Sequence, residues 1–292
     1  MTAAGDRPGR LVLVATPIGN LGDLAPRGRS LLAEADLICC EDTRRTRALL
    51  AALGVPAGGA TGDRLLSLHG HNEHERIPRV LAALEGGGTV AVVSDAGTPG
   101  ISDPGAALVE AAIGGGYAVS TVPGPSSVLG ALVVSGLRTE RFCVEGFLPR
   151  KGAARRGRLD AVLRDPRTTV VLEAPGRVVS TLRDLAAADP RRRVAVVREL
   201  TKVHEEVWRG TVDDAVRAFE VRPPRGEVVL VVDGAPAPAP VADEALAEAV
   251  RARLDEGRAG EGSRHVADAL AAELGVGRRR VYEMVLRIRA GS

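Results

Sequence analysis

The first 122 residues alternate short apolar runs with helix-patterned segments, and this alternation leaves few folds open to the chain. The apolar runs are the predicted strands LVLVA (11–15), ADLICC (35–40), RLLSL (64–68), TVAVVS (89–94) and YAVSTV (117–122). The segments between them place apolar residues at three- and four-residue spacing, which is typical of helices. Continuous apolar strands that alternate with helices predict a parallel sheet covered on both faces.

A second series of apolar runs follows the turn PGPSS (123–127). Its predicted strands are FCVEGF (142–147), TTVVLEA (168–174), RVAVVREL (193–200), VHEEVWRG (203–210) and GEVVLVVDG (226–234). The short connection between the third and fourth of these runs suggests an antiparallel hairpin, so we expect a mixed sheet. The sequence thus predicts two α/β domains, which cover residues 1–122 and 123–234.

The end of the chain differs in composition from these two domains. APAPAP at 235–240 is expected to form a short stiff linker. Residues 241–292 are rich in Ala, Arg and Glu and predict a small helical extension. Within it, Gly275 and Gly277 separate two helical patterns, and Arg278 begins the second. This arrangement is compatible with a helix-turn-helix and equally with two ordinary packed helices.

Charge and cysteine usage limit the classes of protein to consider. The net charge is +2, so a basic binding surface must be sought locally. The three cysteines show no metal spacing, and Cys39 and Cys40 end an apolar run, which predicts buried free thiols and suits a reducing cytoplasm. No apolar run reaches the ~18 residues of a membrane span, and the N-terminus has no apolar signal core. We therefore expect no membrane association.

The turns after the first-domain strands hold most of the chemically useful residues. They read TPIGNLGD, EDTRRT, HGHNEHE, SDAGTPGISDPG and PGPSS. Ligands in open α/β folds bind beyond the carboxyl ends of the strands, so these turns predict a site. None of them matches G-x-G-x-x-G or G-x-x-x-x-G-K-[ST], which argues against a dehydrogenase and a P-loop enzyme.

SDAGTPGISDPG is the most specific of these turns. Its small residues let the backbone wrap closely around a ligand, and Asp95, Thr98 and Ser102 can bind polar groups. Ser126 and Ser127 follow the fifth strand, where they either contact a cofactor or cap a helix.

Two further turns allow more than one interpretation. Asp42, in EDTRRT, either caps the following helix or takes part in catalysis. HGHNEHE holds three histidines, but their spacing matches no established zinc signature. We therefore expect polar substrate contacts or plain surface there, and no metal.

Two charged stretches lie in the second domain. FLPRKGAARRGRL (147–159) concentrates five positive charges in nine residues, which indicates either phosphate contacts or a solvated surface. RELTKVHEEVWRG (198–210) places many ionisable groups beside apolar strands. Such groups are costly there unless they are paired or used in function.

Seven motifs occur in order from about residue 10 to 234: VATPIGNLGD, CEDTRRT, HNEHE, VSDAGTPGISDPG, PGPSS, GFLPR and RELTKVHEE. Together they closely resemble the bacterial small-subunit ribosomal RNA (cytidine-2′-O)-methyltransferases, which are tetrapyrrole-methylase-like enzymes. The resemblance implies two α/β domains with S-adenosylmethionine in the cleft between them. It further implies a cytoplasmic homodimer that methylates a cytidine ribose in the decoding region of 16S ribosomal RNA, within the small ribosomal subunit.

The resemblance also implies which residues bind the cofactor. Gly97-Thr98-Pro99 stands where relatives carry Gly-Asp-Pro, so a polar side chain remains at Thr98 but a charge is lost. Including the turn residues above, the expected cofactor contacts are Pro17, Asp95, Gly97, Thr98, Ile101, Ser102, Ser126, Ser127, Glu173, Ala174 and Leu230.

The implied reaction requires alignment of the methyl group and removal of a hydroxyl proton. Asp42, Lys202 and Glu205 are the candidate catalytic residues, and we favour Lys202 with Glu205 orienting it. A protonated lysine could instead lower the pKa of the hydroxyl. The residues expected to contact RNA phosphates are Arg44, Arg150, Lys151 and Arg155.

Two alternatives stay open. One is a small-molecule methylase that acts on a porphyrin-like ring, although the basic 147–159 stretch and an aromatic content of 2% favour RNA. The other is a nucleic-acid-binding regulator that uses the helical extension.

Overall fold

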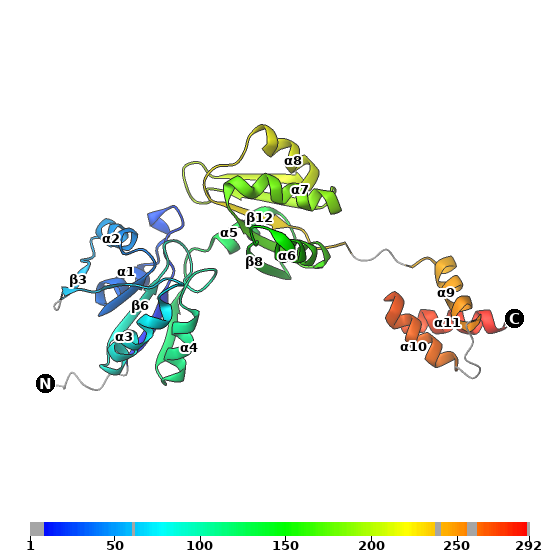
Figure 1. The fold of residues 1–292 in the computed structure, drawn as a ribbon, viewed down its shortest axis with the longest axis horizontal. Coiled ribbons are helices and arrows are strands. Elements are labelled where there is room, and N and C mark those ends of the chain that lie inside the picture. Colours follow the sequence, from blue (N-terminus) through cyan, green and yellow to red (C-terminus); the bar gives the residue numbers. More distant parts are fainter. Residues whose placement is uncertain (1–8, 60–61, 237–240, 256–261, 291–292) are drawn as a thin grey trace. The chain divides into compact units, whose positions relative to one another are not determined.

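The computed structural model describes residues 9–59, 62–236, 241–255 and 262–290. The chain divides into two compact units, Met1–Ala235 and Pro236–Ser292 (Figure 1). In the described part of the chain, the helices are too short or too polar to cross a lipid bilayer.

The first unit begins with a parallel sheet of order β5-β2-β6-β1-β7. Its strands are β1 (Arg10–Val14), β2 (Leu37–Cys40), β5 (Leu65–Ser67), β6 (Thr89–Val93) and β7 (Ala118–Val122). Each strand begins within two residues of its predicted run, and the predicted parallel sheet is confirmed. Two short elements were not predicted: the 3₁₀ turn η1 (Leu21–Asp23) and the hairpin β3 (Gly58–Gly59)–β4 (Gly62–Asp63).

Helices cover both faces of this sheet, because successive strand residues point to opposite sides. Helices α1 (Pro26–Glu34) and α2 (Thr43–Ala52) share one core with Val12 and Val14. The opposite core contains Leu11 together with α3 (Glu73–Glu85) and α4 (Ala106–Gly114). The chain leaves adjacent strands β1 and β6 in opposite directions along the sheet, and such a switch point is where open α/β sheets bind ligands.

The second sheet has the order β11-β10-β12-β9-β8 and is mixed, as predicted. Its strands are β8 (Phe142–Phe147), β9 (Thr168–Glu173), β10 (Arg193–Arg198), β11 (Glu206–Thr211) and β12 (Val228–Val232). Only the β8–β9 pair is parallel among these described strands. The predicted hairpin is the antiparallel pair β10–β11.

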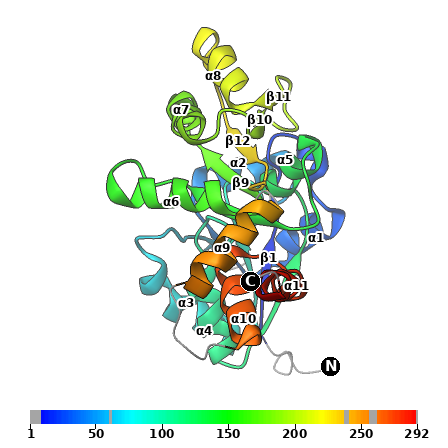
Figure 2. The same cartoon turned by 90° about the vertical axis from the view of Figure 1, so that its right-hand side faces the viewer.

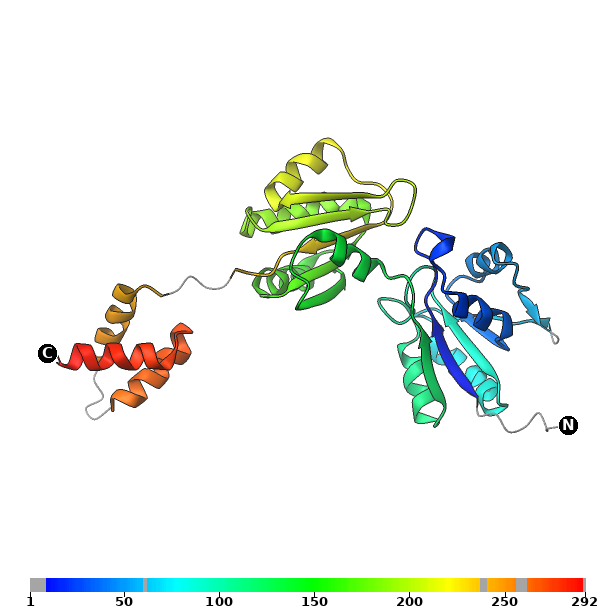
Figure 3. The same ribbon diagram turned by 180° about the vertical axis from the view of Figure 1, so that it is seen from behind.

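One helix covers one face of this sheet and three cover the other. Helix α5 (Ser127–Ser135) packs on the face that includes Val170 and Val197. The second face carries α6 (Gly152–Arg164), the turn η2 (Pro175–Arg177), α7 (Val178–Ala188) and α8 (Val212–Val221). Figure 3 shows both sheets of the first unit from behind. Because α5 packs on the second sheet, residues 127–135 belong with that sheet; the boundary at 122/123 itself stays a prediction.

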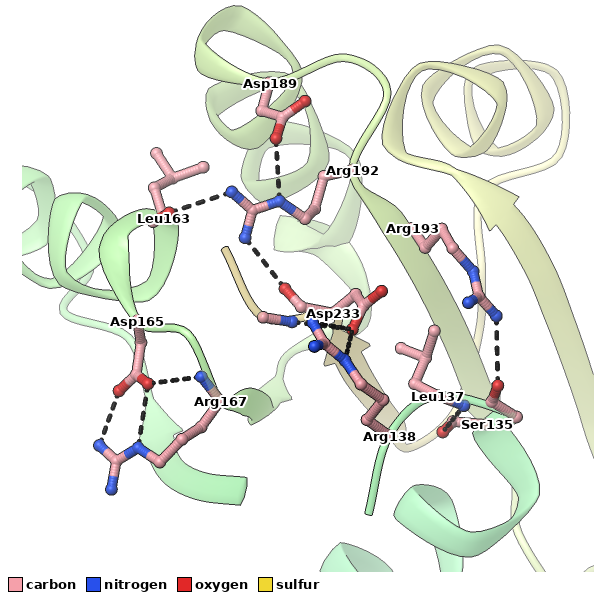
Figure 4. Close-up of polar contacts among 12 residues, drawn as sticks. Ser135, Leu137, Arg138, Leu163, Asp165, Arg167, Asp189, Arg192, Arg193 and Asp233 are labelled. Carbon is pink, nitrogen blue, oxygen red and sulfur yellow. Dashed lines mark hydrogen bonds and ion pairs between the residues drawn. The ribbon is translucent and has the colours of Figure 1, made fainter. Parts of the chain in front are cut away.

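A buried arginine, Arg192, lies at one end of the second sheet, next to the start of β10 and away from the carboxyl end of β9 (Figure 4). Arg192 is 7% exposed, and its Nε lies 2.9 Å from Asp189 Oδ2. Its other two nitrogens each donate to a carbonyl, that of Asp233 and that of Leu163, at 3.0 Å. The guanidinium therefore joins the ends of α7, β12 and α6, and its charge is satisfied within the fold.

The second unit contains α9 (Asp243–Asp255), α10 (Ser263–Leu274) and α11 (Arg278–Ala290) (Figure 2). The three helices share an apolar core that includes Leu246, Val266 and Val281. Gly275 ends α10 with φ of 62°, a conformation that glycine adopts without strain.

Candidate functional site

The loops after β1 and β6 are joined at the carboxyl edge of the first sheet. Thr16 N donates to Gly97 O at 2.8 Å, and Gly97 N donates back to Thr16 O at 3.0 Å. Thr16 Oγ1 also donates to Ser94 O at 3.1 Å. Gly97 has φ of 90°, so the loop requires glycine there. Pro17 directly follows this joint, so the structure places it beside Gly97.

The loop after β7 joins the same group. Thr98 Oγ1 donates to Pro125 O at 3.2 Å, which places Ser126 and Ser127 near the β6 loop. Ser126 caps α5, because its Oγ accepts from Leu129 N at 3.3 Å. The hydroxyl of Thr98 thus connects two loops.

The loop after β2 contributes Asp42, which caps α2. Asp42 Oδ1 accepts from Arg44 N at 2.8 Å, and Arg44 Nη2 lies 2.8 Å from Asp42 Oδ2. These hydrogen bonds lower the pKa of Asp42 to about 2. Asp42 N donates to Asp95 Oδ1 at 3.1 Å, which joins this loop to the β6 loop. A carboxylate with so low a pKa is a weak proton acceptor near neutral pH.

Asp103 is a half-buried carboxylate at this edge that was not among the predicted site residues. Burial raises its pKa to about 6, and the nearby charges of Glu41 and Asp95 add to that effect. Burial likewise raises the pKa of Glu41. The burial of Asp103 arises from tertiary packing, so nothing in the local sequence distinguished it from a turn residue.

The HGHNEHE turn after β5 forms structural contacts. Asn72 Oδ1 accepts from His69 N at 2.8 Å. Glu73 is 9% exposed, and its Oε1 accepts from Gly105 N at 3.1 Å and Leu108 N at 3.0 Å, at the N-terminus of α4. Within the described ranges, no three His, Cys, Asp or Glu side chains are grouped so that they could hold a metal ion.

Lys202 lies in the loop between β10 and β11, where two carboxylates surround it. Its Nζ is 3.0 Å from Glu199 Oε1 and 3.3 Å from Glu227 Oε2. Burial lowers the pKa of Lys202, but the hydrogen bonds and charges of these glutamates outweigh it, and the pKa is raised overall. Lys202 is therefore a cation at neutral pH.

Glu205 does not orient Lys202, contrary to our expectation. Its Oε2 accepts from Thr201 N at 2.6 Å, within the turn. Glu199 orients Lys202 instead, because its Oε1 contacts Lys202 Nζ and is itself held by a hydrogen bond from Glu227 N at 2.9 Å. The spacing of Glu199 and Lys202 in RELTK was a signal for this pair, whereas Glu227 comes from a distant segment.

The Lys202 loop packs against the loop after β1. A Cβ added at Gly19 would collide with Lys202 Cγ and lie 2.8 Å from Thr201 Oγ1 and 3.1 Å from Leu200 O. Glu199 and Thr201 have positive φ values of 50° and 66°, which few non-glycine residues adopt. Gly19 therefore permits the close contact that brings Lys202 to the carboxyl edge of the first sheet.

Two residues expected at the cofactor have other contacts. Glu173 is 2% exposed, and its carboxylate binds Arg177 and accepts from Thr181 Oγ1 at 2.7 Å. Leu230 is fully buried in the middle of β12, so its side chain packs in the core. Ala174, which follows β9, is exposed. Ile101, which was also expected to contact the cofactor, is 52% exposed. Ser102 lies close to Gly146 of β8, because a Cβ added at Gly146 would be 3.3 Å from Ser102 Oγ.

The expected RNA contacts separate into exposed and buried residues. Arg155 is 9% exposed, and its Nη2 donates to Thr181 Oγ1 at 3.0 Å and Asp184 Oδ2 at 2.8 Å. Because its charge is satisfied within the fold, Arg155 is not placed for an RNA phosphate, and that prediction is corrected. Arg150 and Lys151 are exposed, and the side chain of Arg44 is 86% exposed while it binds Asp42.

Residues 10–216 match the family described as tetrapyrrole (corrin/porphyrin) methylases. Ribosomal RNA small subunit methyltransferase I of Mycobacterium tuberculosis is 45% identical over 286 residues, which cover 96% of either chain. The protein of the same name from Thermotoga maritima is 44% identical over 226 residues, which cover 77% of this chain and 99% of that one.

A solved structure shares the fold. It is uroporphyrin-III C-methyltransferase from Thermus thermophilus in complex with S-adenosylhomocysteine. The TM-score is 0.53 at 23% identity, and the match covers 77% of this chain and 97% of that one.

Proposed function

The chain belongs to the tetrapyrrole methylase family, and we propose that within this family it acts on RNA. The proposed reaction is methylation of the ribose 2′-oxygen of a cytidine in the decoding region of 16S ribosomal RNA. The cofactor is S-adenosylmethionine. The observation that carries the choice of RNA is the 96% coverage of a relative named for small-subunit ribosomal RNA. Exposed basic residues after β8 agree with that choice, because they can contact RNA phosphates.

The loops at the carboxyl edge fit a cofactor that has both polar and apolar parts. Ile101, at 52% exposure, offers an apolar surface, and the half-buried Thr98 and Ser127 offer hydroxyl groups. Pro17 and Gly97 hold the adjoining backbone in place. When bound, the cofactor supplies an electrophilic methyl group and a sulfide leaving group.

Lys202 acts as a cation in this proposal and not as a base, because Glu199 and Glu227 keep it protonated. A positive charge near the attacking hydroxyl lowers its pKa and stabilises the developing oxyanion. Asp103 accepts the proton, since a pKa of about 6 leaves it ionised yet basic near neutral pH. Asp42 keeps its structural role at the start of α2.

Arg150 and Lys151 bind RNA phosphates at the start of α6. Phe147 precedes them at the end of β8 and is 59% exposed, so its ring is available to stack on a base. Phe147 was not among the predicted RNA contacts, although it adjoins the basic stretch.

The proposal includes a cytoplasmic homodimer. The exposed apolar side chains of Leu129 and Val133 on α5, and of Phe142 and Val144 on edge strand β8, support self-association. Light scattering coupled to gel filtration tests this part independently of activity.

The decisive experiment incubates the protein with labelled S-adenosylmethionine and either isolated small ribosomal subunits or a uroporphyrinogen. We expect label in RNA as 2′-O-methylcytidine, and none in the tetrapyrrole. Label on a base, or on the tetrapyrrole alone, would reject the proposed substrate while leaving the methyltransferase assignment intact.

A further inference from the structure

The second unit contains a cavity lined by basic and aromatic side chains. The cavity has a volume of about 420 Å³ and is lined by Arg264 of α10 and by Arg278, Arg279 and Tyr282 of α11. No acidic side chain belongs to its described lining. A second cavity of this unit, about 600 Å³, has a mixed lining that includes Asp243, Glu244, Glu248, Arg251 and Arg287.

The cavity is basic because the fold groups three arginines in its lining, and not because the second unit is rich in positive charge. Residues 241–292 contain nine arginines and nine acidic residues, so the unit has no general positive charge. A lining that holds three arginines and no acidic side chain favours anions over cations.

Arg278 and Arg279 of the lining are more exposed than Arg280 of the same helix. Arg280 binds Asp243 Oδ1 at 2.6 Å and Val241 O at 2.5 Å, which fastens α11 to the start of α9. The side chains of Arg278 and Arg279 are 63% and 93% exposed, against 41% for Arg280, and Arg278 joins α11 to Asp268 of α10 through two of its nitrogens. Their acidic partners, Asp268 and Glu283, are themselves more than half exposed. The exposed Arg279–Glu283 pair contributes little to stability, and a phosphate offers Arg278 the same two-oxygen contact as Asp268, so phosphate can replace both carboxylates.

Tyr282 gives the cavity a second kind of contact. It is half-buried and packs on the core of the unit, which limits the movement of its ring. The chain has only six aromatic residues, and this one lies among three arginines. Guanidinium groups bind phosphates and an aromatic ring stacks on a base, so the combination matches a polynucleotide better than an isolated anion.

We propose that this cavity binds the sugar–phosphate backbone of RNA, with phosphates on Arg264, Arg278 and Arg279 and a base on Tyr282. The identity of the RNA as ribosomal rests on the proposed function, but the binding does not depend on methyl transfer. The Thermotoga maritima relative is covered to 99% by a match of only 226 residues, so it is shorter than this chain. It nevertheless has the same name as the Mycobacterium tuberculosis relative, which matches over 286 residues. The contact should therefore add affinity for the substrate and leave the chemical step unchanged.

The test uses the full-length protein and a labelled fragment of small-subunit ribosomal RNA. The double variant Arg278→Gln/Arg279→Gln removes two charges from the cavity. Arg251→Gln/Arg287→Gln is the matched control, since it removes two charges from the other cavity of the same unit. Binding is measured by fluorescence anisotropy at several salt concentrations, with thermal melts to confirm folding.

We expect the cavity variant to bind RNA roughly tenfold more weakly. Its plot of log affinity against log salt should be flatter by about 1.4–1.8, as two lost phosphate contacts predict. Tyr282→Ala should weaken binding without changing that slope. The control should stay within about twofold of the wild type, and the affinity of every variant for S-adenosylmethionine should be unchanged.

An equal loss in the control, or no loss in the cavity variant, would overturn the inference. So would competition by polyglutamate as strong as that by RNA, because the cavity would then be a site for acidic protein segments. A fall in kcat at saturating RNA would also reject it. If the wild type binds RNA but methylates none, the proposed function fails, whereas the anisotropy series still decides this inference.

Discussion

Two groups of charged residues in the first unit differ in how far they are buried and in how many of their hydrogen-bonding groups have partners. In the second α/β region, Glu173 and Arg155 are at least nine-tenths buried, and each is bonded to Thr181. At the carboxyl edge of the first sheet, Asp103 is half-buried with a raised pKa, and the side chain of Lys202 is 27% exposed. A charge that is buried and fully bonded is committed to the fold, whereas one left partly accessible can act on a ligand.

The largest expected effect comes from Glu173→Ala. It removes a carboxylate with a fully buried side chain, so Arg177 loses its ion pair and Thr181 loses the acceptor of its hydroxyl proton. We expect the free energy of unfolding to fall by about 3–5 kcal/mol, as measured by urea denaturation. Glu220→Ala is the control, because Glu220 pairs with Arg183 on the surface and should cost at most about 1 kcal/mol. Equal losses would contradict the structural role assigned to Glu173.

Lys202→Ala should instead reduce activity with little change in stability. We expect the single-turnover rate constant of methylation to fall roughly 10²-fold or more, because the cation at the proposed site is lost. Glu205→Ala leaves the pairs of Lys202 with Glu199 and Glu227 intact and should have a much smaller effect. If Glu205→Ala proved as damaging as Lys202→Ala, Glu205 would regain the orienting role that its position in the sequence suggests.

Gly19→Ala tests the contact between the β1 loop and the Lys202 loop. The added methyl group would collide with Lys202 and displace it, so we expect kcat to fall roughly 10–10²-fold. Gly157→Ala in α6 is the control, since a Cβ there meets no atom within 4 Å. Unchanged kcat for Gly19→Ala, measured under the same single-turnover conditions, would argue that this contact is not needed for the reaction.

The smallest effect should appear in the pH dependence of stability. The pKa of Asp103 is about 6 in the folded protein and near 3.8 when unfolded, so the folded state binds the proton more tightly. Stability should therefore fall by about 1–2 kcal/mol as pH rises from about 4 to 6, once solvent screening is allowed for. Asp103→Asn should flatten this slope in urea titrations, and the part that remains is expected from Glu41, whose pKa is also raised.

Asp42→Asn provides the contrast, because a pKa of about 2 keeps Asp42 ionised throughout that pH window. It should leave the slope between pH 4 and 6 in place. A slope that stays unchanged in Asp103→Asn and disappears in Asp42→Asn would reverse the roles assigned to the two carboxylates.

The sequence by itself determined the fold class and the edge at which we propose the site. Apolar periodicity reports which residues must avoid water, and this requirement placed ten strands and located the turns after β1, β2, β5, β6 and β7. Parallel pairing then brings those turns to one edge, so the sequence alone sufficed to group Pro17, Asp95, Gly97 and Thr98.

Only the tertiary structure decided what each charged side chain does there. Arg155 and Arg150 come from the same basic stretch, yet one is bonded to Thr181 and Asp184 and the other is exposed. Lys202 is paired with Glu227, which lies 25 residues further along the chain, and not with its near neighbour Glu205. Burial and hydrogen-bond partners arise when distant segments pack together, and these two properties set the pKa and the availability of a side chain.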